Sequence, residues 1–168
     1  MSARAAWRLE TLDFSSVRRY TAGKVDWLAN GLASEGRLAS EPRIAGVMQP
    51  VATCRLGERV GDVRSRLAGD GDLCVVVNAE EVVLGDLRGK ALSDSPAEAL
   101  VDDVMDPAPS TYRPNVSVHE MAEHLSGTKA QRVLVTTGDG RLLGLLRRDA
   151  VMHAAHDGGP YLASGDTA

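Results

Sequence analysis

The sequence predicts an α+β fold built from two similar units packed face to face. Residues 44–100 recur as residues 102–156 at an offset of 57 to 59 positions. Each copy contains two short runs rich in Val and Leu, which is typical of strands. Each copy also contains apolar residues at helical spacing. A duplication of this size indicates tandem copies of one small fold, and the clefts along their seam are where small ligands tend to bind.

The repeat is evident from short sequence motifs that occur in the same order in both copies. Val47-Met48-x-Pro50 recurs as Val104-Met105-x-Pro107 at an offset of 57. The next matches are at an offset of 58, and from Leu84 onward the offset is 59. The matched pairs at 58 are Thr53 with Thr111, Arg55 with Arg113, Val60 with Val118, Leu67 with Leu125, Val75 with Val133 and Val77 with Val135. The pairs at 59 include Gly85 with Gly144 and Arg88 with Arg147.

The predicted order of elements in each copy is β-α-β-β-α. In the first copy we expect strands at 51–54, 73–77 and 82–87, a helix from Val60 to Leu67, and a closing helix from about Gly89. In the second copy we expect strands at 110–113, 132–136 and 141–146, a helix from Val118 to Leu125, and a closing helix from about Arg148.

The central helix and the hairpin of the second copy have the clearest local signals. Four apolar residues between Val118 and Leu125 fall at i, i+3, i+4 and i+7, which is one helical face. We expect this face to meet the sheet or a second copy of the chain. Ser117 is a predicted N-cap, and Glu120 completes a capping box. Residues 137–140, Thr-Gly-Asp-Gly, predict the hairpin turn.

The composition narrows the classes of function. Apolar residues make up 43% of the 168 and aromatic residues only 4%, which predicts an aliphatic core. The net charge of −4 argues against a nucleic-acid partner. The apolar runs are far shorter than the ~20 residues that cross a bilayer, and no secretory signal is evident. Two cysteines, Cys54 and Cys74, form no disulfide framework, so we expect buried reduced thiols and a cytoplasmic location.

The ends of the chain lie outside the repeat. Residues 1–41 do not match either copy, and residues 36–42 are typical of a linker. Residues 157–168 are small and polar, which predicts a flexible tail.

The sequence motifs of the two copies, and their order, resemble those of the CBS domain, named for cystathionine β-synthase. The carrying segments are VMQP and VMDP, PSTYRPNVSVHEMAEHL, and RVLVTTGDGRLLGLLRRDAV. The resemblance implies two domains paired through their sheets into a Bateman module. It also implies an adenosyl ligand such as AMP, ADP, ATP or S-adenosylmethionine in the seam clefts, and a homodimer formed through the helices.

The same resemblance supplies the candidate ligand contacts. In that family a Gly, a hydroxyl residue three positions on and an Asp three beyond it hold phosphate and ribose at a helix N-terminus. The second copy has Gly144, Arg147 and Asp149, so an Arg replaces the hydroxyl residue and the spacing to the Asp is one shorter. The predicted contacts are Thr111, Tyr112, Arg132, Gly144, Leu145, Arg147 and Asp149, with Thr53, Arg88 and Lys90 in the first copy.

Several of these residues have two interpretations. Asp149 either reaches a ribose or caps the closing helix. Arg88 and Lys90 either attract an anion or form a solvated face of a degenerate site, because Lys90 cannot accept hydrogen bonds from a diol. The two threonines are either cleft residues or plain β-formers, and Arg132 either meets phosphate or is an exposed residue at a strand start. Asp86 interrupts an apolar strand, and simple alternation would turn it to solvent.

The histidines form no convincing metal set. His119 and His124 are five apart on a helix and do not share a face, and His153 and His156 lie near a helix end. We therefore predict no metal site.

Residues 1–41 resemble the C-terminal end of a rhodanese-like domain. The resemblance rests on a helix at Arg4–Leu12, a strand carrying Phe14, Val17 and Tyr20, and a segment with Gly23, Trp27, Gly31 and Leu32. We expect Trp27, Leu28 and Leu32 to pack on the repeats or on a second subunit. The catalytic cysteine of that family would precede this segment, and no Cys precedes Cys54, so a sulfurtransferase is a minor hypothesis.

Two functional hypotheses remain. The first is a non-catalytic regulatory protein that binds an adenosyl nucleotide in the cleft, mainly through the second copy, and signals to an effector protein that the sequence does not identify. The alternative is a ligand-free dimerisation and interaction scaffold.

Overall fold

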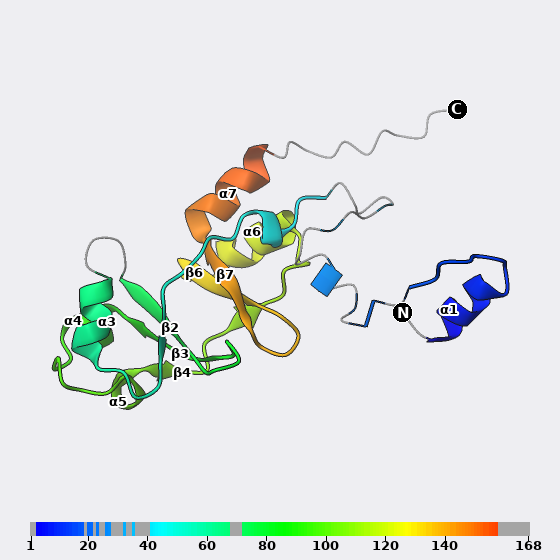
Figure 1. Ribbon diagram of the computed structural model, residues 1–168. Helices are drawn as coiled ribbons and strands as arrows, with labels where there is room; N and C mark the ends of the chain where they lie inside the picture. The colour runs from blue at the N-terminus through cyan, green and yellow to red at the C-terminus, as the bar shows by residue number, and fades with distance from the viewer. Residues whose placement is uncertain are drawn as a thin grey trace.

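The computed structural model describes residues 3–18, 20–21, 23, 26–27, 32, 35, 41–67 and 72–157. Figure 1 shows helices and strands of the two repeats as two adjoining halves. The helices are α1 (Ala3–Glu10), the 3-10 helix η1 (Ile44–Gly46), α3 (Val60–Arg66), α4 (Gly89–Ser93), α5 (Val101–Val104), α6 (Val118–Ser126) and α7 (Arg148–Asp157). The strands are β1 (Thr53–Arg55), β2 (Leu73–Val77), β3 (Val83–Arg88), β4 (Asp106–Pro107), β5 (Thr111–Tyr112), β6 (Arg132–Thr136) and β7 (Leu142–Arg147).

Two small mixed sheets form the centre of the molecule. The first sheet has the order β1-β2-β3-β4 and the second has the order β5-β6-β7. In both sheets the leading pair is parallel and the hairpin pair is antiparallel. The predicted α+β class and the order β-α-β-β-α in each copy are therefore confirmed. The Ser117 cap is also present, since its Oγ accepts a hydrogen bond from Glu120 N at 3.1 Å.

The register of the sheets corrects the match between the repeats. Thr53 pairs with Val75, whereas Thr111 pairs with Leu134. Val75 therefore corresponds to Leu134, an offset of 59, and the expected matches of Val75 with Val133 and Val77 with Val135 are wrong. The run Val75-Val76-Val77 looks the same when shifted by one residue, so sequence identity could not choose the register. In a strand this one-residue shift exchanges the two faces.

Alternate residues of β2 and β6 enter different cores. Val75 and Val77 meet Leu134 between the two sheets. Cys74 and Val76 face α3 and α4, and the second sheet meets α6 and α7 in the same way through Val133 and Val135. Both faces of β2 are covered, and all five of its residues are buried. The apolar face of α6, from Val118 to Leu125, packs on its own sheet.

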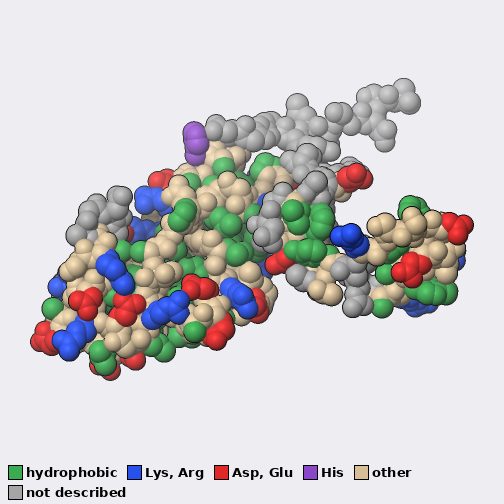
Figure 2. All heavy atoms as spheres, in the orientation of Figure 1, with side chains coloured by type: hydrophobic (Ala, Val, Ile, Leu, Met, Phe, Trp, Pro, Cys, Tyr) green, Lys and Arg blue, Asp and Glu red, His purple; other side chains and the backbone are tan. Residues whose placement is uncertain are grey.

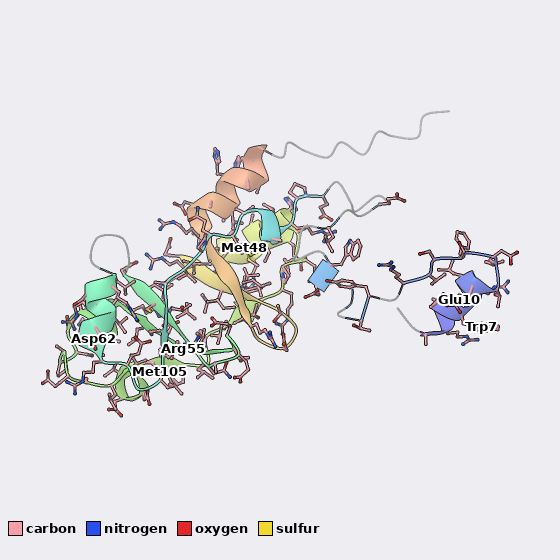
Figure 3. The ribbon with its side chains drawn as sticks, in the orientation of Figure 1. Trp7, Glu10, Met48, Arg55, Asp62 and Met105 are labelled. Carbon is pink, nitrogen blue, oxygen red and sulfur yellow. The ribbon has the colours of Figure 1, made fainter. Side chains whose placement is uncertain are left out.

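Each repeat is completed by the segment that leads into the other. Gln49 N and Leu145 N each donate to the other residue's carbonyl, at 2.9 and 2.8 Å, which joins the start of the first repeat to β7. Ile44 lies fully buried in the core beneath α6. Reciprocally, β4 pairs with β3, and Val101 enters the core beneath α3. Figure 3 shows Met48 beside the α6 half and Met105 beside the α3 half.

The two hairpins also join at their tips. Val83 N donates to Gly140 O at 3.1 Å, and Leu142 N donates to Glu81 O at 2.9 Å. These bonds and the exchanged segments together join the two sheets from one hairpin to the other.

Gly85 and Gly144 have a structural role at the exchanged segments. A Cβ on Gly144 would lie 2.8 Å from the carbonyl oxygen of Gln49, and a Cβ on Gly85 would lie 2.8 Å from that of Asp106. Both contacts are with backbone, which cannot swing aside as a side chain can. Close approach of the exchanged strand therefore requires glycine at both positions.

The N-terminal segment carries no buried residue in α1. Trp7 and Phe14 are 62% and 59% exposed. The predicted helix forms, but residues 14–18 and Tyr20 have no strand assignment, so the predicted strand there is wrong within the described part of the chain. Trp27 lies edge-on to Tyr20, with ring centroids 5.2 Å apart. Leu28, most of the 36–42 linker, and the predicted tail from residue 158 onward lie outside the described residues.

We predict that Gly144→Ala destabilises the fold by about 1–3 kcal/mol, because the added methyl group forces the Gln49 backbone away from β7. The free energy of unfolding, measured by urea titration, checks this. Gly138→Ala is the matched control in the same hairpin, since its Cβ would have nothing within 4 Å, and it should change stability by less than about 0.5 kcal/mol. Equal effects of the two substitutions would contradict the role assigned to Gly144.

Candidate functional site

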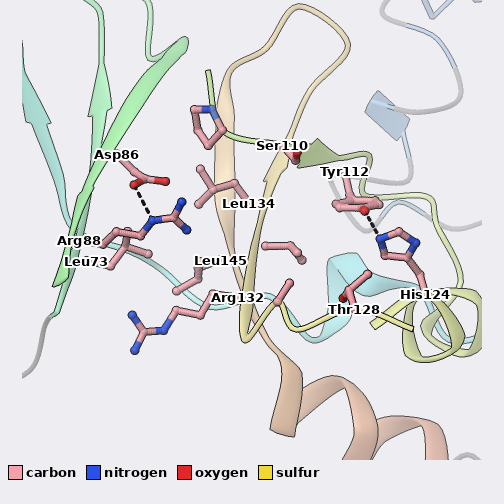
Figure 4. A pocket seen from close by; sticks show the side chains of 13 residues that line it. Leu73, Asp86, Arg88, Ser110, Tyr112, His124, Thr128, Arg132, Leu134 and Leu145 are labelled. Atoms are coloured by element: carbon pink, nitrogen blue, oxygen red, sulfur yellow. Dashed lines mark hydrogen bonds and ion pairs between the residues drawn. The ribbon is translucent and has the colours of Figure 1, made fainter. Parts of the chain in front are cut away.

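A cavity of about 330 Å³ lies at the seam between the two sheets. Three of its lining residues come from β2 and β3, and ten come from residues 109–145 (Figure 4). The lining residues are Leu73, Asp86, Arg88, Pro109, Ser110, Tyr112, His124, Thr128, Ala130, Arg132, Val133, Leu134 and Leu145. Its size is within the range of small-molecule sites.

The middle of the cavity is apolar and one end is aromatic. Leu134 and Leu145 extend from the core between the sheets into its wall. At the far end the Tyr112 hydroxyl is hydrogen-bonded to His124 Nε2, and the two rings are 5.2 Å apart (Figure 4). Flat apolar and aromatic surfaces of this kind suit the face of a planar ring.

Arg132 crosses the seam from the first residue of β6. Its Nη1 and Nη2 lie 2.6 and 2.7 Å from the two carboxylate oxygens of Asp72, just before β2. The hydrogen bond from Arg132 holds the pKa of Asp72 below its ordinary value. Arg132 is therefore positioned by a bidentate contact that an anionic ligand would have to replace.

Asp86 lies in the opposite wall and is only 4% exposed. The expectation that alternation turns it to solvent is wrong, because the second sheet covers the face of β3 that alternation would have exposed. Asp86 pairs across the strands with Val75, which belongs to the core between the sheets. At the equivalent position of β7, paired with Leu134, the chain has Leu145.

Asp86 is incompletely paired. Its Oδ1 lies 3.2 Å from Arg88 Nε, which is within ion-pair range, but the geometry is not that of a hydrogen bond and this buried oxygen accepts none within the described structure. Arg88 is shared with Asp106, 3.0 Å from its Nη2. Burial raises the pKa of Asp86, the Arg88 charge lowers it in part, and Asp106 raises it further.

Four of the predicted ligand contacts meet in this cavity: Arg88, Tyr112, Arg132 and Leu145. Arg88 thus faces residues of the second repeat and does not share this cavity with Lys90 or Thr53. Four further polar side chains line the cavity that were not among the predicted contacts: Asp86, Ser110, His124 and Thr128. Asp86 could have been found by comparing the repeats, since a carboxylate replaces an aliphatic residue there.

The other predicted contacts lie outside the lining of this cavity. Thr53 and Thr111 are exposed on the short strands β1 and β5, and Lys90 is exposed in the first turn of α4. Gly144 is covered by the Gln49 backbone. Thus position in the repeat motif did not by itself identify the cavity residues.

Arg147 and Asp149 pair with each other where β7 meets α7, with Arg147 Nε 3.3 Å from Asp149 Oδ1. Hydrogen bonds from Arg147 and from Ala150 N lower the pKa of Asp149. Asp149 lies in the first turn of α7, one position inside the helix start, so it is not the N-cap. There its charge complements the helix dipole. Arg147 is the cross-strand neighbour of Arg132, which places this pair beside the cavity.

The two cysteines are buried, and the hydrogen bond between their thiols lowers the pKa of Cys74 while it raises that of Cys54. Cys54 and Cys74 are free and buried in the core beneath α3. A hydrogen bond to the Cys74 thiol and burial raise the pKa of Cys54 well above its ordinary value, which opposes formation of a thiolate. Among the described residues, no group of three or more His, Cys, Asp or Glu is placed to hold a metal ion.

The surface charge and the helix lengths of the described residues bear on the requirements of nucleic-acid and membrane partners. On the face shown in Figure 2, basic and acidic side chains are intermixed over the first repeat. None of the described helices has the length and apolar character that crossing a membrane requires.

Comparison with known proteins identifies the fold. Residues 101–157 match the CBS domain family. No curated protein matches the chain. The cytosolic domain of the Mg²⁺ channel MgtE in complex with ATP has a TM-score of 0.61 and 23% identity, covering 70% of this chain. This chain spans about half, 51%, of that structure's length.

Two further structures are matched over nearly their whole length. CBSX2, a CBS-pair protein from Arabidopsis thaliana, in complex with AMP has a TM-score of 0.59 and 23% identity, with 69% of this chain and 97% of that chain covered. The CBS domain pair of MJ0100, in complex with 5′-methylthioadenosine and S-adenosyl-L-methionine, has a TM-score of 0.58 and 12% identity, with 70% and 98% covered. These matches establish a CBS-pair fold. The rhodanese resemblance of residues 1–41 stays a prediction.

Ionisation of Asp86 predicts an unusual pH dependence of stability. Below its ordinary pKa of 3.8 the side chain is neutral in both the folded and unfolded states. As pH rises through the higher pKa of the folded state, the unfolded chain ionises more readily, so the free energy of unfolding of the wild type falls relative to that of Asp86→Asn. Above that pKa the difference is constant.

Urea unfolding of both proteins from about pH 3.5 to about pH 7.5 measures this difference. A difference that stays flat, or that moves in favour of the wild type as pH rises, would show that Arg88 compensates the burial of Asp86.

Proposed function

We propose that the chain is a non-catalytic regulatory module that binds an adenosyl compound in the cavity between its two sheets. The observation that carries this proposal is the convergence of apolar walls, an aromatic end and two guanidinium groups from both repeats on one cavity of about 330 Å³. Such a combination suits a ligand with a planar base and a charged arm. Three similar structures are complexes with adenosyl compounds: one with ATP, one with AMP, and one with 5′-methylthioadenosine and S-adenosyl-L-methionine.

The residues proposed to contact the ligand are those that line the cavity. Leu134, Leu145 and Tyr112 offer surface to the base, and Arg88 and Arg132 offer positive charge to a phosphate or carboxylate. Thr53, Lys90, Thr111, Gly144, Arg147 and Asp149 remain predicted contacts. The division into units at 44–100 and 102–156, with 1–41 and 157–168 flanking them, is likewise proposed.

Ligand binding would be coupled to the arrangement of the repeats through Arg132. The Arg132–Asp72 ion pair joins the two sheets across the seam, and an anionic ligand competes with Asp72 for Arg132. Such a ligand shifts the population between two arrangements of the repeats only if the two arrangements differ in their affinity for the ligand. This would be the signal read by an effector protein.

We also propose a homodimer in the cytoplasm. Exposed Trp7 and Phe14 offer apolar surface that a second copy would cover, and the free thiols of Cys54 and Cys74 fit a reducing compartment. Light scattering of the purified chain should then give about twice 17.8 kDa.

An interaction scaffold without a ligand is the alternative function. It is favoured by Lys90, which stands in the turn where the second repeat has Asp149, and by the pairing of Asp149 with Arg147 outside the cavity lining. In this alternative the duplicated fold serves only to join subunits or partners.

We predict that AMP, ADP, ATP or S-adenosylmethionine raises the melting temperature of the protein, whereas GTP and NADH do so less. A ligand at about 100 times its dissociation constant stabilises the fold by roughly 2.7 kcal/mol. Arg132→Met should weaken binding of the active ligand at least about tenfold, a loss of about 1.4 kcal/mol. Thermal shift followed by titration calorimetry measures both effects.

Asp72→Asn is the matched control, because it breaks the same ion pair but keeps the guanidinium. It should leave affinity unchanged or increase it. If Asp149→Asn abolished binding while Arg132→Met did not, the ligand would lie at the Arg147–Asp149 pair. If no compound shifted the melting temperature, the scaffold alternative would replace this proposal.

A further inference from the structure

Asp86 is a buried carboxylate that the fold does not require. The structurally equivalent position in the second sheet is Leu145, which lines the same cavity and packs in the core between the sheets. An aliphatic side chain is therefore compatible with this place in the architecture. A buried carboxylate with an unsatisfied oxygen lowers stability, so its presence at the cavity needs a reason other than packing.

The negative charge of Asp86 is only partly compensated. Asp86 and Asp106 are opposite each other on β3 and β4, and both share the single guanidinium of Arg88. The Arg88 side chain is 58% exposed, whereas the Asp86 side chain is 5% exposed. Water therefore screens the positive charge of Arg88 but does not solvate the negative charge of Asp86, so the ion pair compensates the buried carboxylate only in part. The other guanidinium of the cavity, Arg132, is already engaged by Asp72.

This arrangement discriminates between the charged arms of adenosyl compounds. A polyphosphate placed in the cavity would bring negative charge next to the buried carboxylate of Asp86. An arm that carries a positive group beside a carboxylate would match Asp86 with the positive group and Arg88 or Arg132 with the carboxylate. In a partly buried site such charge matching is weakly screened by solvent.

We infer that Asp86 makes the cavity selective for an adenosyl ligand with a positively charged, zwitterionic arm, of which S-adenosylmethionine is the test compound, over adenosine polyphosphates. The inference rests on the proposed function and names the ligand class within it. Asp86 is then the specificity-determining residue of the site. Asp106, which is 64% exposed and reaches Arg88 from outside the cavity lining, has no direct part.

Titration calorimetry of the full chain with S-adenosylmethionine and with ATP tests the inference. The wild type should bind S-adenosylmethionine at least about tenfold more tightly than ATP. Asp86→Asn, which keeps the shape and removes the charge, should weaken S-adenosylmethionine at least about tenfold and leave ATP unchanged or tighter. Asp106→Asn is the control for the loss of a carboxylate from Arg88, and it should preserve the preference.

Thermal unfolding without ligand provides a measurement that does not depend on binding. Asp86→Asn and Asp86→Leu should melt at the same temperature as the wild type or higher at neutral pH, because the second sheet already accommodates Leu145. Both variants melting lower would show that Asp86 is structural and would overturn the inference.

The binding outcomes separate the inference from the proposed function. A wild type that prefers ATP, or an Asp86→Asn variant that weakens both compounds equally, would overturn the inference and keep the nucleotide site. A wild type that binds neither compound, nor AMP or ADP, would overturn both.

Discussion

The exchange of leading segments between the repeats is the constraint on which the rest of the structure depends. The backbone of Gln49 pairs with β7, and β4 pairs with β3, so the edge of each sheet is covered by chain that leads into the other repeat. Neither half has a complete core without this exchange, since Ile44 and Val101 fill the space beneath α6 and α3. The exchange also affects the charge at the cavity, because β4 places Asp106 opposite Asp86 and both carboxylates share Arg88.

Duplication gives the two repeats corresponding strand positions, but the side chains at these positions have diverged. In the cleft described here Asp86, Tyr112 and Arg132 supply polar groups, whereas the corresponding positions hold Leu145, Cys54 and Leu73. At these three positions the cavity therefore has polar side chains where the other repeat has apolar ones. A repeat-by-repeat search for one ligand motif misses this, because the cavity combines strands of both repeats.

The local elements could be predicted from the sequence, whereas the contacts between repeats could not. Leu73–Val77 and Arg132–Thr136 are strands with the predicted bounds because β-branched runs end at strong turn signals. The four-residue helix α5 and the two-residue strand β4 are too short for any periodicity. Contacts with the first repeat stabilise them, since β4 pairs with β3 and Val101 of α5 packs in the core beneath α3. The burial of Asp86 was missed for the same reason, since alternation along β3 says nothing of a second sheet above it.

The location of Asp86 links selectivity to the conformation of the pair. It sits on β3 of the first sheet, while Tyr112 and Arg132, the proposed contacts opposite, belong to the second. A ligand that satisfies the buried carboxylate would do so by joining the two sheets, so the interaction that selects the ligand also changes the stability of the seam. A carboxylate on the exposed face of a helix could select charge but would leave the seam unaffected. In a regulatory module, a buried carboxylate between the sheets lowers stability but can also couple binding to conformation. The free energy gained when a ligand pairs with Asp86 is available to bias the arrangement of the two repeats.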